Sequence, residues 1–230
     1  MSKYKYLLFD ADNTLFDFDR CEKAAFREAI SGSGLEFSED VYADYHVIND
    51  GLWKRLEKGT IDRVNLRKER FRLLFEKRGV AGESYLSVAE KYEVCLGMHT
   101  YEIDGVYELL SRLSRNYGIY IITNGLTSVQ ESRFSLTRLR EFIDGVFVSE
   151  NVGYAKPDKR YFDCVISNIP CESADECLVI GDSLSSDIDG AIAYGIDCCW
   201  YNRRGASADG RNINYEIRDI TEIEAILEHE

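Results

Sequence analysis

Short runs of apolar residues recur along the chain, and each run ends in a polar or glycine-containing turn. Within these runs the apolar residues follow one another without alternating with polar ones, which is typical of strands buried on both faces. Strands of this kind belong to parallel sheets. The pattern predicts strands at Tyr4–Phe9, Ile119–Thr123, Gly145–Ser149, Cys177–Gly181 and Asp197–Tyr201.

Segments with helical spacing of apolar residues lie between the later runs. The clearest are Gly105–Arg115, Asp158–Ile169 and Ser185–Tyr194, with Gly195 placed to end the last and Pro157 expected at the start of the second. Alternation of strands and helices favours a parallel sheet that is covered by helices on both faces. We therefore expect an α/β fold with a doubly wound, Rossmann-like parallel sheet.

The stretch that follows the first predicted strand has a different pattern. From Phe16 to Tyr101 there are amphipathic helical segments, separated by loop signals at 31–34, 59–60 and 79–82, and no convincing strand. Such a stretch is too long for an ordinary connection between two strands. We expect residues 1–15 and 102–230 to form the α/β core and residues 16–101 to form a separate helical cap domain.

The charge balance limits the possible partners. Asp and Glu number 41 and Lys and Arg 28, which gives a net charge of −13. A nucleic acid would be repelled, because its binding depends on Lys and Arg that neutralise phosphates, whereas a small anion can still bind at a local site.

The seven cysteines include no CxxC pair, and no apolar run is long enough to span a bilayer. We expect a cytoplasmic protein with reduced thiols and no membrane partner, either a monomer or a dimer.

Polar side chains follow the predicted strands at the sheet edge where proteins of this class bind ligands. Asp10 and Asp12 come directly after the first strand, and two carboxylates so close are costly unless a cation or a shared proton relieves their repulsion. Thr123 and Asn124 follow the second strand and can offer donors to an anion. Lys156 precedes a proline that fixes the backbone beside it.

Two further carboxylates follow the fourth predicted strand. Asp182 stands directly beyond it, and Asp187 falls at the start of the next helix, where the helix dipole favours a carboxylate in any case. Singly, each signal has an ordinary alternative, such as a solvated turn at Asp10 and Asp12. Together at one sheet edge, the carboxylates would hold Mg²⁺, which prefers oxygen ligands, and Lys156 and Thr123 would hold a phosphate. We therefore expect a small phosphorylated metabolite as the ligand.

The order of these motifs resembles that of the haloacid dehalogenase (HAD) superfamily, over essentially the whole chain. The motifs are Asp10-Ala-Asp12-Asn-Thr-Leu, Thr123-Asn-Gly, Lys156-Pro and Gly181-Asp182-Ser with Asp187. The resemblance implies a Mg²⁺-dependent phosphomonoester hydrolase in which Asp10 is the nucleophile that becomes an aspartyl-phosphate and Asp12 is the general acid and base. It also implies that Thr123, Asn124 and Lys156 bind the phosphoryl group, and that Mg²⁺ is held by Asp10, the backbone carbonyl of Asp12, Asp182 and, directly or through a supporting contact, Asp187.

Asp12 argues against a dehalogenase, because a halide leaves without a proton. The stretch from Asp10 to Asp19 resembles the pyrimidine 5′-nucleotidase branch of the superfamily (YjjG/YfnB-type), except at Asn13, where many members have an acidic residue. This resemblance implies a 5′-nucleotidase acting on pyrimidine nucleoside monophosphates. The aromatic residues that could stack on a base are expected mainly in the core; they are Phe16, Phe18, Tyr45 and Trp53.

Other activities stay open at this point. A phosphatase acting on sugar phosphates or on acylneuraminate 9-phosphate, or a phosphosugar mutase, would use the same core motifs. A phosphonate hydrolase would need a cap lysine, for which Lys54 and Lys58 are available. A non-catalytic binding protein is disfavoured, because such a protein would be expected to have lost at least one of Asp10, Asp12, Lys156 and Asp182.

Overall fold

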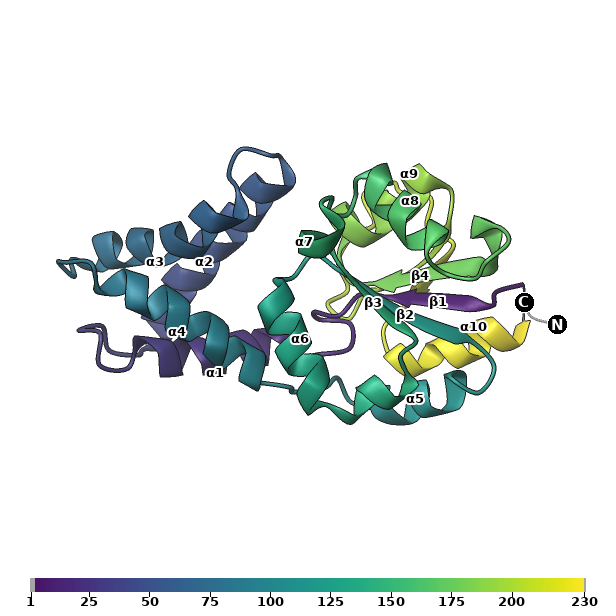
Figure 1. The fold of residues 1–230 in the computed structure, drawn as a ribbon, viewed down its shortest axis with the longest axis horizontal. Coiled ribbons are helices and arrows are strands. Elements are labelled where there is room, and N and C mark those ends of the chain that lie inside the picture. The colour runs from purple at the N-terminus through teal and green to yellow at the C-terminus, as the bar shows by residue number, and fades with distance from the viewer. Residues whose placement is uncertain (1–2, 230) are drawn as a thin grey trace. The chain divides into compact units, whose positions relative to one another are not determined.

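The computed structural model describes residues 3–229 and divides into two compact units. The first unit comprises Met1–Phe18 and Thr100–Glu230, and the second comprises Asp19–His99. The first contains the sheet and the second is helical (Figure 1).

A parallel sheet of six strands, counted over the described residues, forms the centre of the first unit, in the order β3-β2-β1-β4-β5-β6. The expected doubly wound α/β fold is thereby confirmed. The strands are β1 (Tyr6–Phe9), β2 (Gly118–Thr123), β3 (Gly145–Val148), β4 (Cys177–Gly181), β5 (Asp197–Tyr201) and β6 (Tyr215–Ile217). Strand β6 was not predicted, because its three residues at the edge of the sheet include an exposed Glu216 and make no apolar run.

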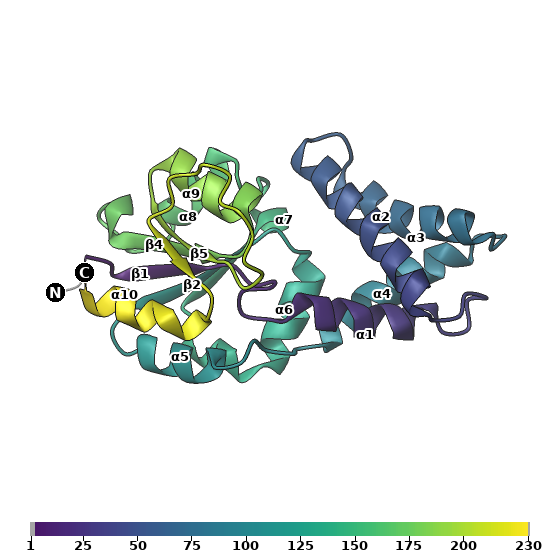
Figure 2. The ribbon, with the colours of Figure 1, turned by 180° about the vertical axis from the view of Figure 1, so that it is seen from behind.

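The predicted strands are largely apolar because their residues are buried in cores on both faces of the sheet. In β1, Leu7 and Phe9 enter one core, whereas Leu8 enters the core on the opposite face. Helices α5 (Val106–Leu113) and α10 (Ile223–His229) cover the first face, and α8 (Lys159–Ser167) and α9 (Asp189–Tyr194) cover the second (Figures 1 and 2). Helix α6 (Thr127–Leu136) follows β2, and the short α7 (Ser149–Val152) follows β3.

Two helix starts differ from the expectation. Asp158 caps α8 by accepting a hydrogen bond from the backbone of Arg160, so Pro157 lies just outside the helix and not at its first position. The segment predicted as one helix over Ser185–Tyr194 begins as a π-helical turn at Leu184–Ile188 and becomes α-helical only at Asp189. Gly195 ends that helix with a φ of 94°, as predicted.

The second unit consists of α1 (Phe18–Ile30), α2 (Glu39–Glu57), α3 (Arg63–Arg78) and α4 (Ser84–Met98). The predicted loops separate these helices, and side-chain caps from Ser38 and Asp62 begin α2 and α3. Aromatic rings dominate its core, since Phe26, Tyr45, Phe71 and Tyr92 are fully buried and in contact with one another. This unit therefore has an apolar core of its own.

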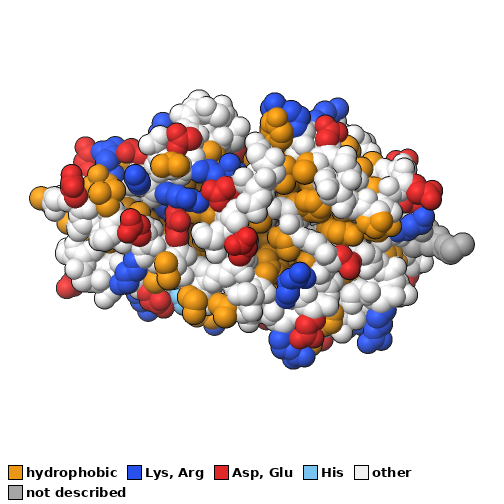
Figure 3. All heavy atoms as spheres, viewed as in Figure 1, with side chains coloured by type: hydrophobic (Ala, Val, Ile, Leu, Met, Phe, Trp, Pro, Cys, Tyr) orange, Lys and Arg blue, Asp and Glu red, His pale blue; other side chains and the backbone are white. Residues whose placement is uncertain are grey.

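Charged side chains of both signs are interspersed on the face shown in Figure 3. That face offers no continuous basic surface of the kind that nucleic-acid backbones require. Among residues 3–229, no helix combines the length and the apolar character needed to cross a membrane.

Candidate active site

Three carboxylates meet at the carboxyl edge of the sheet. Strands β1 and β4 are neighbours with Phe9 beside Ile180, so Asp10 and Asp182 leave the sheet side by side. Asp187 reaches the same point from the π-helical turn. One carboxylate oxygen of each of these three residues lies within 4.8 Å of the others.

Lys156 is buried among these carboxylates. Its Nζ donates to Oδ1 of Asp10 and Oδ1 of Asp187, each at 2.6 Å, and to the backbone oxygen of Ile122, also at 2.6 Å. The ammonium group therefore uses all three of its protons, and its direction is fixed from three sides. Only 1% of the side chain is exposed.

Burial and mutual repulsion determine how this cluster titrates. Burial, followed by the charges of Asp187 and Asp182, raises the pKa of Asp10 well above its usual range, against the opposing charge of Lys156. Burial and the charge of Asp187 likewise raise the pKa of Asp182 to about 7. Burial opposes the charge on Lys156, but Asp10 and Asp187 outweigh it and raise the pKa of that ammonium. The cluster carries more negative charge than one lysine relieves.

The turn after β2 supports Lys156 and presents a hydroxyl group. The side-chain amide of Asn124 donates to the backbone oxygen of Lys156 and accepts from its N–H, both at 2.9 Å. Thr123 Oγ1 accepts from the backbone of Gly125 at 3.0 Å and from Gln130 at 3.3 Å, so its own proton can be donated elsewhere. The structure thus brings both residues to the site, with Asn124 engaged by the lysine.

The carboxylates form a suitable donor set for a hard cation. Asp10, Asp182 and Asp187 offer only oxygen ligands, and three carboxylates around one lysine leave negative charge that a hard cation would relieve. These side chains fit Mg²⁺ by their chemistry. The role of the Asp12 backbone carbonyl as a further ligand stays a prediction.

A family model described as a haloacid dehalogenase-like hydrolase matches residues 4–195. The chain belongs to the haloacid dehalogenase-like hydrolases. It is 37% identical to the HAD-hydrolase YfnB of Bacillus subtilis (strain 168), with 99% of this chain and 97% of that relative covered. A crystal structure of YfnB bound to magnesium has a TM-score of 0.91 and 36% identity to this chain, covering 98% of this chain and 99% of that one.

Two further relatives are described as pyrimidine 5′-nucleotidases. PynA of Streptococcus pneumoniae (strain ATCC BAA-255 / R6) is 36% identical, with 86% of this chain and 84% of PynA covered. YjjG of Escherichia coli (strain K12) is 30% identical, with 98% of both chains covered. The resemblance inferred from the four motifs is therefore confirmed at the level of the family.

In this hydrolase the carboxylate of Asp12 is held by two residues that the sequence analysis did not identify. Gln130 Nε2 donates to Asp12 Oδ2 at 2.7 Å, and Arg133 Nη1 donates to Asp12 Oδ1. Both come from α6, which the apolar pattern did not predict as a helix. The available signal was the spacing of a polar and a basic residue at i and i+3, which places both on one helix face.

Of the aromatic residues considered for base stacking, Phe16 and Tyr45 are fully buried and belong to the core, as expected. Phe18 and Trp53 are half-buried. A pocket of about 170 Å³ adjoins Asp182 and is lined also by Asn13, Arg203 and Arg204, among others. It extends the site with polar and cationic groups.

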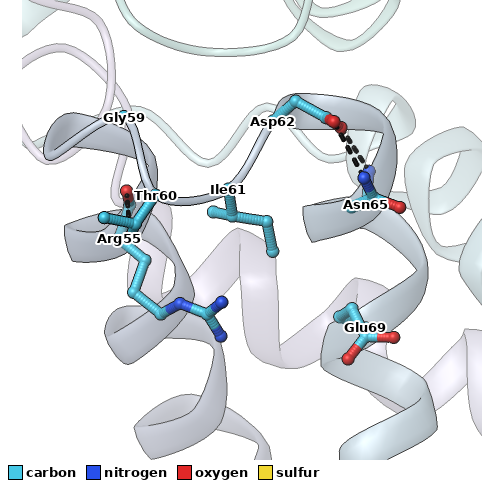
Figure 4. A pocket seen from close by; sticks show the side chains of 7 residues that line it. All are labelled: Arg55, Gly59, Thr60, Ile61, Asp62, Asn65 and Glu69. Carbon is cyan, nitrogen blue, oxygen red and sulfur yellow. Dashed lines mark hydrogen bonds between the residues drawn. The ribbon is translucent and has the colours of Figure 1, made fainter.

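The helical unit has a polar hollow of its own, of about 520 Å³, between the end of α2 and the start of α3 (Figure 4). Asn65 is fixed by two hydrogen bonds to the carboxylate of Asp62. Its backbone N–H and its side-chain amide each donate to Asp62 at 2.8 Å. The Thr60 hydroxyl donates to the backbone of Arg55 at 3.0 Å. The lining of this pocket is mostly polar and contains no aromatic ring; the lining residues are Arg55, Gly59, Thr60, Ile61, Asp62, Asn65 and Glu69.

Proposed function

We propose that this chain is a Mg²⁺-dependent phosphomonoester hydrolase that forms an aspartyl-phosphate on Asp10, and that its substrates are pyrimidine nucleoside 5′-monophosphates. The observation that carries the proposal is the buried arrangement of Asp10, Lys156 and two further carboxylates at one sheet edge. The substrate class is supported by the relatives PynA and YjjG. The cytoplasmic location and the assignment of residues 16–101 as a cap domain belong to the same proposal.

Asp10 is the nucleophile in this reaction. Lys156 engages Oδ1, so attack on phosphorus falls to Oδ2. The bond from Asp10 to phosphorus forms as the bond from phosphorus to the ester oxygen breaks, and Asp12 gives its proton to the leaving oxygen. A water molecule then attacks phosphorus, Asp12 takes the proton of that water, and the carboxylate of Asp10 leaves.

The remaining residues supply charge and orientation. The positive charge of Lys156 would offset the negative charge of the phosphoryl group, and the hydroxyl of Thr123 would bind one of its oxygens. Asn124 would hold Lys156 in place through its two backbone hydrogen bonds. Asp10, Asp182 and Asp187 would hold Mg²⁺, which when bound offsets the repulsion between carboxylate and phosphate. Covalent catalysis thereby divides one difficult hydrolysis into two displacements at phosphorus.

The test is the release of inorganic phosphate, with Mg²⁺, from a panel of nucleoside monophosphates, sugar phosphates and acylneuraminate 9-phosphate. We expect strong turnover of UMP, dUMP or dTMP that is lost with EDTA and in Asp10→Asn. The exposed Asp175→Asn is the matched control and should keep full activity.

Other outcomes would change the proposal in defined ways. Preference for a sugar phosphate would keep the mechanism and contradict the nucleotidase assignment. A stable phosphorylated enzyme that isomerises a sugar phosphate without net release would indicate a mutase. No release from any ester would contradict the phosphatase proposal as a whole.

A further inference from the structure

The carboxylate of Asp12 is held at both of its oxygens by α6. Gln130 Nε2 donates to Oδ2 at 2.7 Å, and Arg133 Nη1 pairs with Oδ1. The two donors are 1% and 0% exposed, whereas the side chain of Asp12 is 25% exposed. The carboxylate of Asp12 is therefore partly exposed to solvent and is hydrogen-bonded by two buried side chains.

The two holding residues are themselves fixed. The guanidinium group of Arg133 lies over the ring of Phe16 at 4.7 Å and near that of Phe18 at 5.8 Å. Gln130 Nε2 also donates to Thr123 Oγ1 at 3.3 Å. A Cβ on Gly125 would stand 2.4 Å from Gln130 Nε2, so a glycine is needed there for Gln130 to reach these acceptors.

Packing by itself gives no reason for these side chains. A fully buried guanidinium is expensive to desolvate unless it is paired, and an apolar side chain of similar volume would fill the same space at lower cost. The group that Arg133 pairs with, Asp12, stands two residues after Asp10 on a short turn, and its carboxylate is contacted by the side chains of Gln130 and Arg133. Orientation of a reacting group is a large part of what an active site contributes.

We infer that Gln130 and Arg133 are positioning residues that fix the carboxylate of Asp12 for proton transfer. This inference rests on the proposed function, in which Asp12 protonates the leaving oxygen and then activates water. A carboxylate has about four lone-pair sites, so the two hydrogen bonds from α6 leave each oxygen a further site through which the proton can pass.

The test compares two esters that differ in their need for a general acid. UMP has an alkoxide leaving group that requires a proton, whereas p-nitrophenolate leaves without one. For Arg133→Met and Gln130→Leu we expect kcat on UMP to fall by about 10- to 100-fold, within the range of general acid catalysis, with KM changed less than about threefold. On p-nitrophenyl phosphate, the transfer of the phosphoryl group to Asp10 should stay fast in these variants, whereas the hydrolysis of the aspartyl-phosphate should become slow.

The different effect on the two steps gives a kinetic signature that general damage to the site would not produce. The variants should release a burst of about one equivalent of p-nitrophenolate per site, followed by slow turnover, because only the second step of that reaction needs Asp12. In the background of Asp12→Asn, the further substitution Arg133→Met should lower kcat by less than about twofold. The effects of residues that act through one another are not additive. Arg138→Met, whose side chain is 70% exposed, is the matched control and should behave as the wild type.

Each result decides between alternatives. An equal loss on both esters without a burst, or losses that multiply in the double variant, would overturn the inference. Thermal unfolding identifies a variant that fails to fold, and Gln130→Leu then carries the test, because Gln130 is uncharged. Absence of phosphatase activity in the wild type would contradict the proposed function, whereas an active wild type with additive variants would contradict only the positioning role.

Discussion

The carboxylate of Asp187 occupies the space that a side chain on Gly181 would need. A Cβ on Gly181 would lie 2.3 Å from Oδ2 and 2.4 Å from Cγ of Asp187. That close approach allows Asp187 to bond to Lys156 Nζ at 2.6 Å and to accept from the backbone of Ser183 at 3.1 Å. The glycine at the end of β4 is therefore part of the geometry of the site.

Gly181→Ala should displace Asp187 from Lys156. We expect phosphatase activity to fall at least about tenfold, and the free energy of unfolding to fall by about 1–3 kcal/mol, because the added methyl group overpacks a buried site. Gly51→Ala is the control, since a Cβ there meets nothing within 4 Å. Kinetic assays and urea unfolding of both variants check this prediction, and an active Gly181→Ala would contradict it.

Lys156→Met should affect both activity and stability. It leaves the buried carboxylates of Asp10 and Asp187 without their shared cation, which should lower the free energy of unfolding by about 3–5 kcal/mol. Activity should fall by about 10²–10³-fold, because the nucleophile of the proposed reaction, Asp10, loses the cation that orients it and offsets negative charge at the site. The exposed Lys159→Met on α8 serves as the control in the same assays. Wild-type stability in Lys156→Met would show that the ion pairs contribute nothing.

Mg²⁺ should stabilise the folded protein, because a ligand that binds only the folded state adds about 2.7 kcal/mol at a hundred times its dissociation constant. We expect the thermal unfolding midpoint of the wild type to rise with added Mg²⁺ and to return to its starting value with EDTA. Asp182→Asn, which removes a carboxylate from the cluster, should abolish most of this rise, and Asp175→Asn should not. An equal rise in all three proteins would place Mg²⁺ elsewhere.

The helical unit should contribute a pH dependence to stability through His46. Its Nδ1 lies 2.9 Å from Oε2 of the buried Glu22, and this hydrogen bond raises the pKa of His46 above its ordinary value of about 6.5. A raised folded-state pKa means that the stabilisation is complete below about pH 6.5 and is lost as the pH rises through the folded-state value.

The side chain of His46 is 49% exposed, so we expect this contribution to be no more than about 1 kcal/mol. Urea unfolding at pH 6 and pH 8 measures it. His46→Gln should lose less stability than the wild type between these two pH values, whereas His229→Gln should follow the wild type. If His46→Gln and the wild type lose the same amount, Glu22 does not stabilise the charged imidazole.

Much of the core and of the site could be predicted because the information is local. The apolar runs predicted five strands, since a strand buried on both faces must be apolar at consecutive positions. Parallel strands end at one edge of the sheet, so the residues just after them meet whatever the details of packing. Asp10 and Asp182, which directly follow the neighbouring strands β1 and β4, meet for this reason.

Tertiary structure alone decided which residues hold these groups. Gln130 and Arg133 lie more than a hundred positions from Asp12, and α6 reaches that turn because β1 and β2 pair in the sheet. The approach of Asp187 to Gly181 likewise depends on a π-helical turn that no local preference predicted. Strand β6 pairs with β5 at the edge of the sheet, and its Ile217 enters the core there. Local patterns specify which segments form and where they end, whereas the partners of a buried polar group depend on how distant segments pack around it.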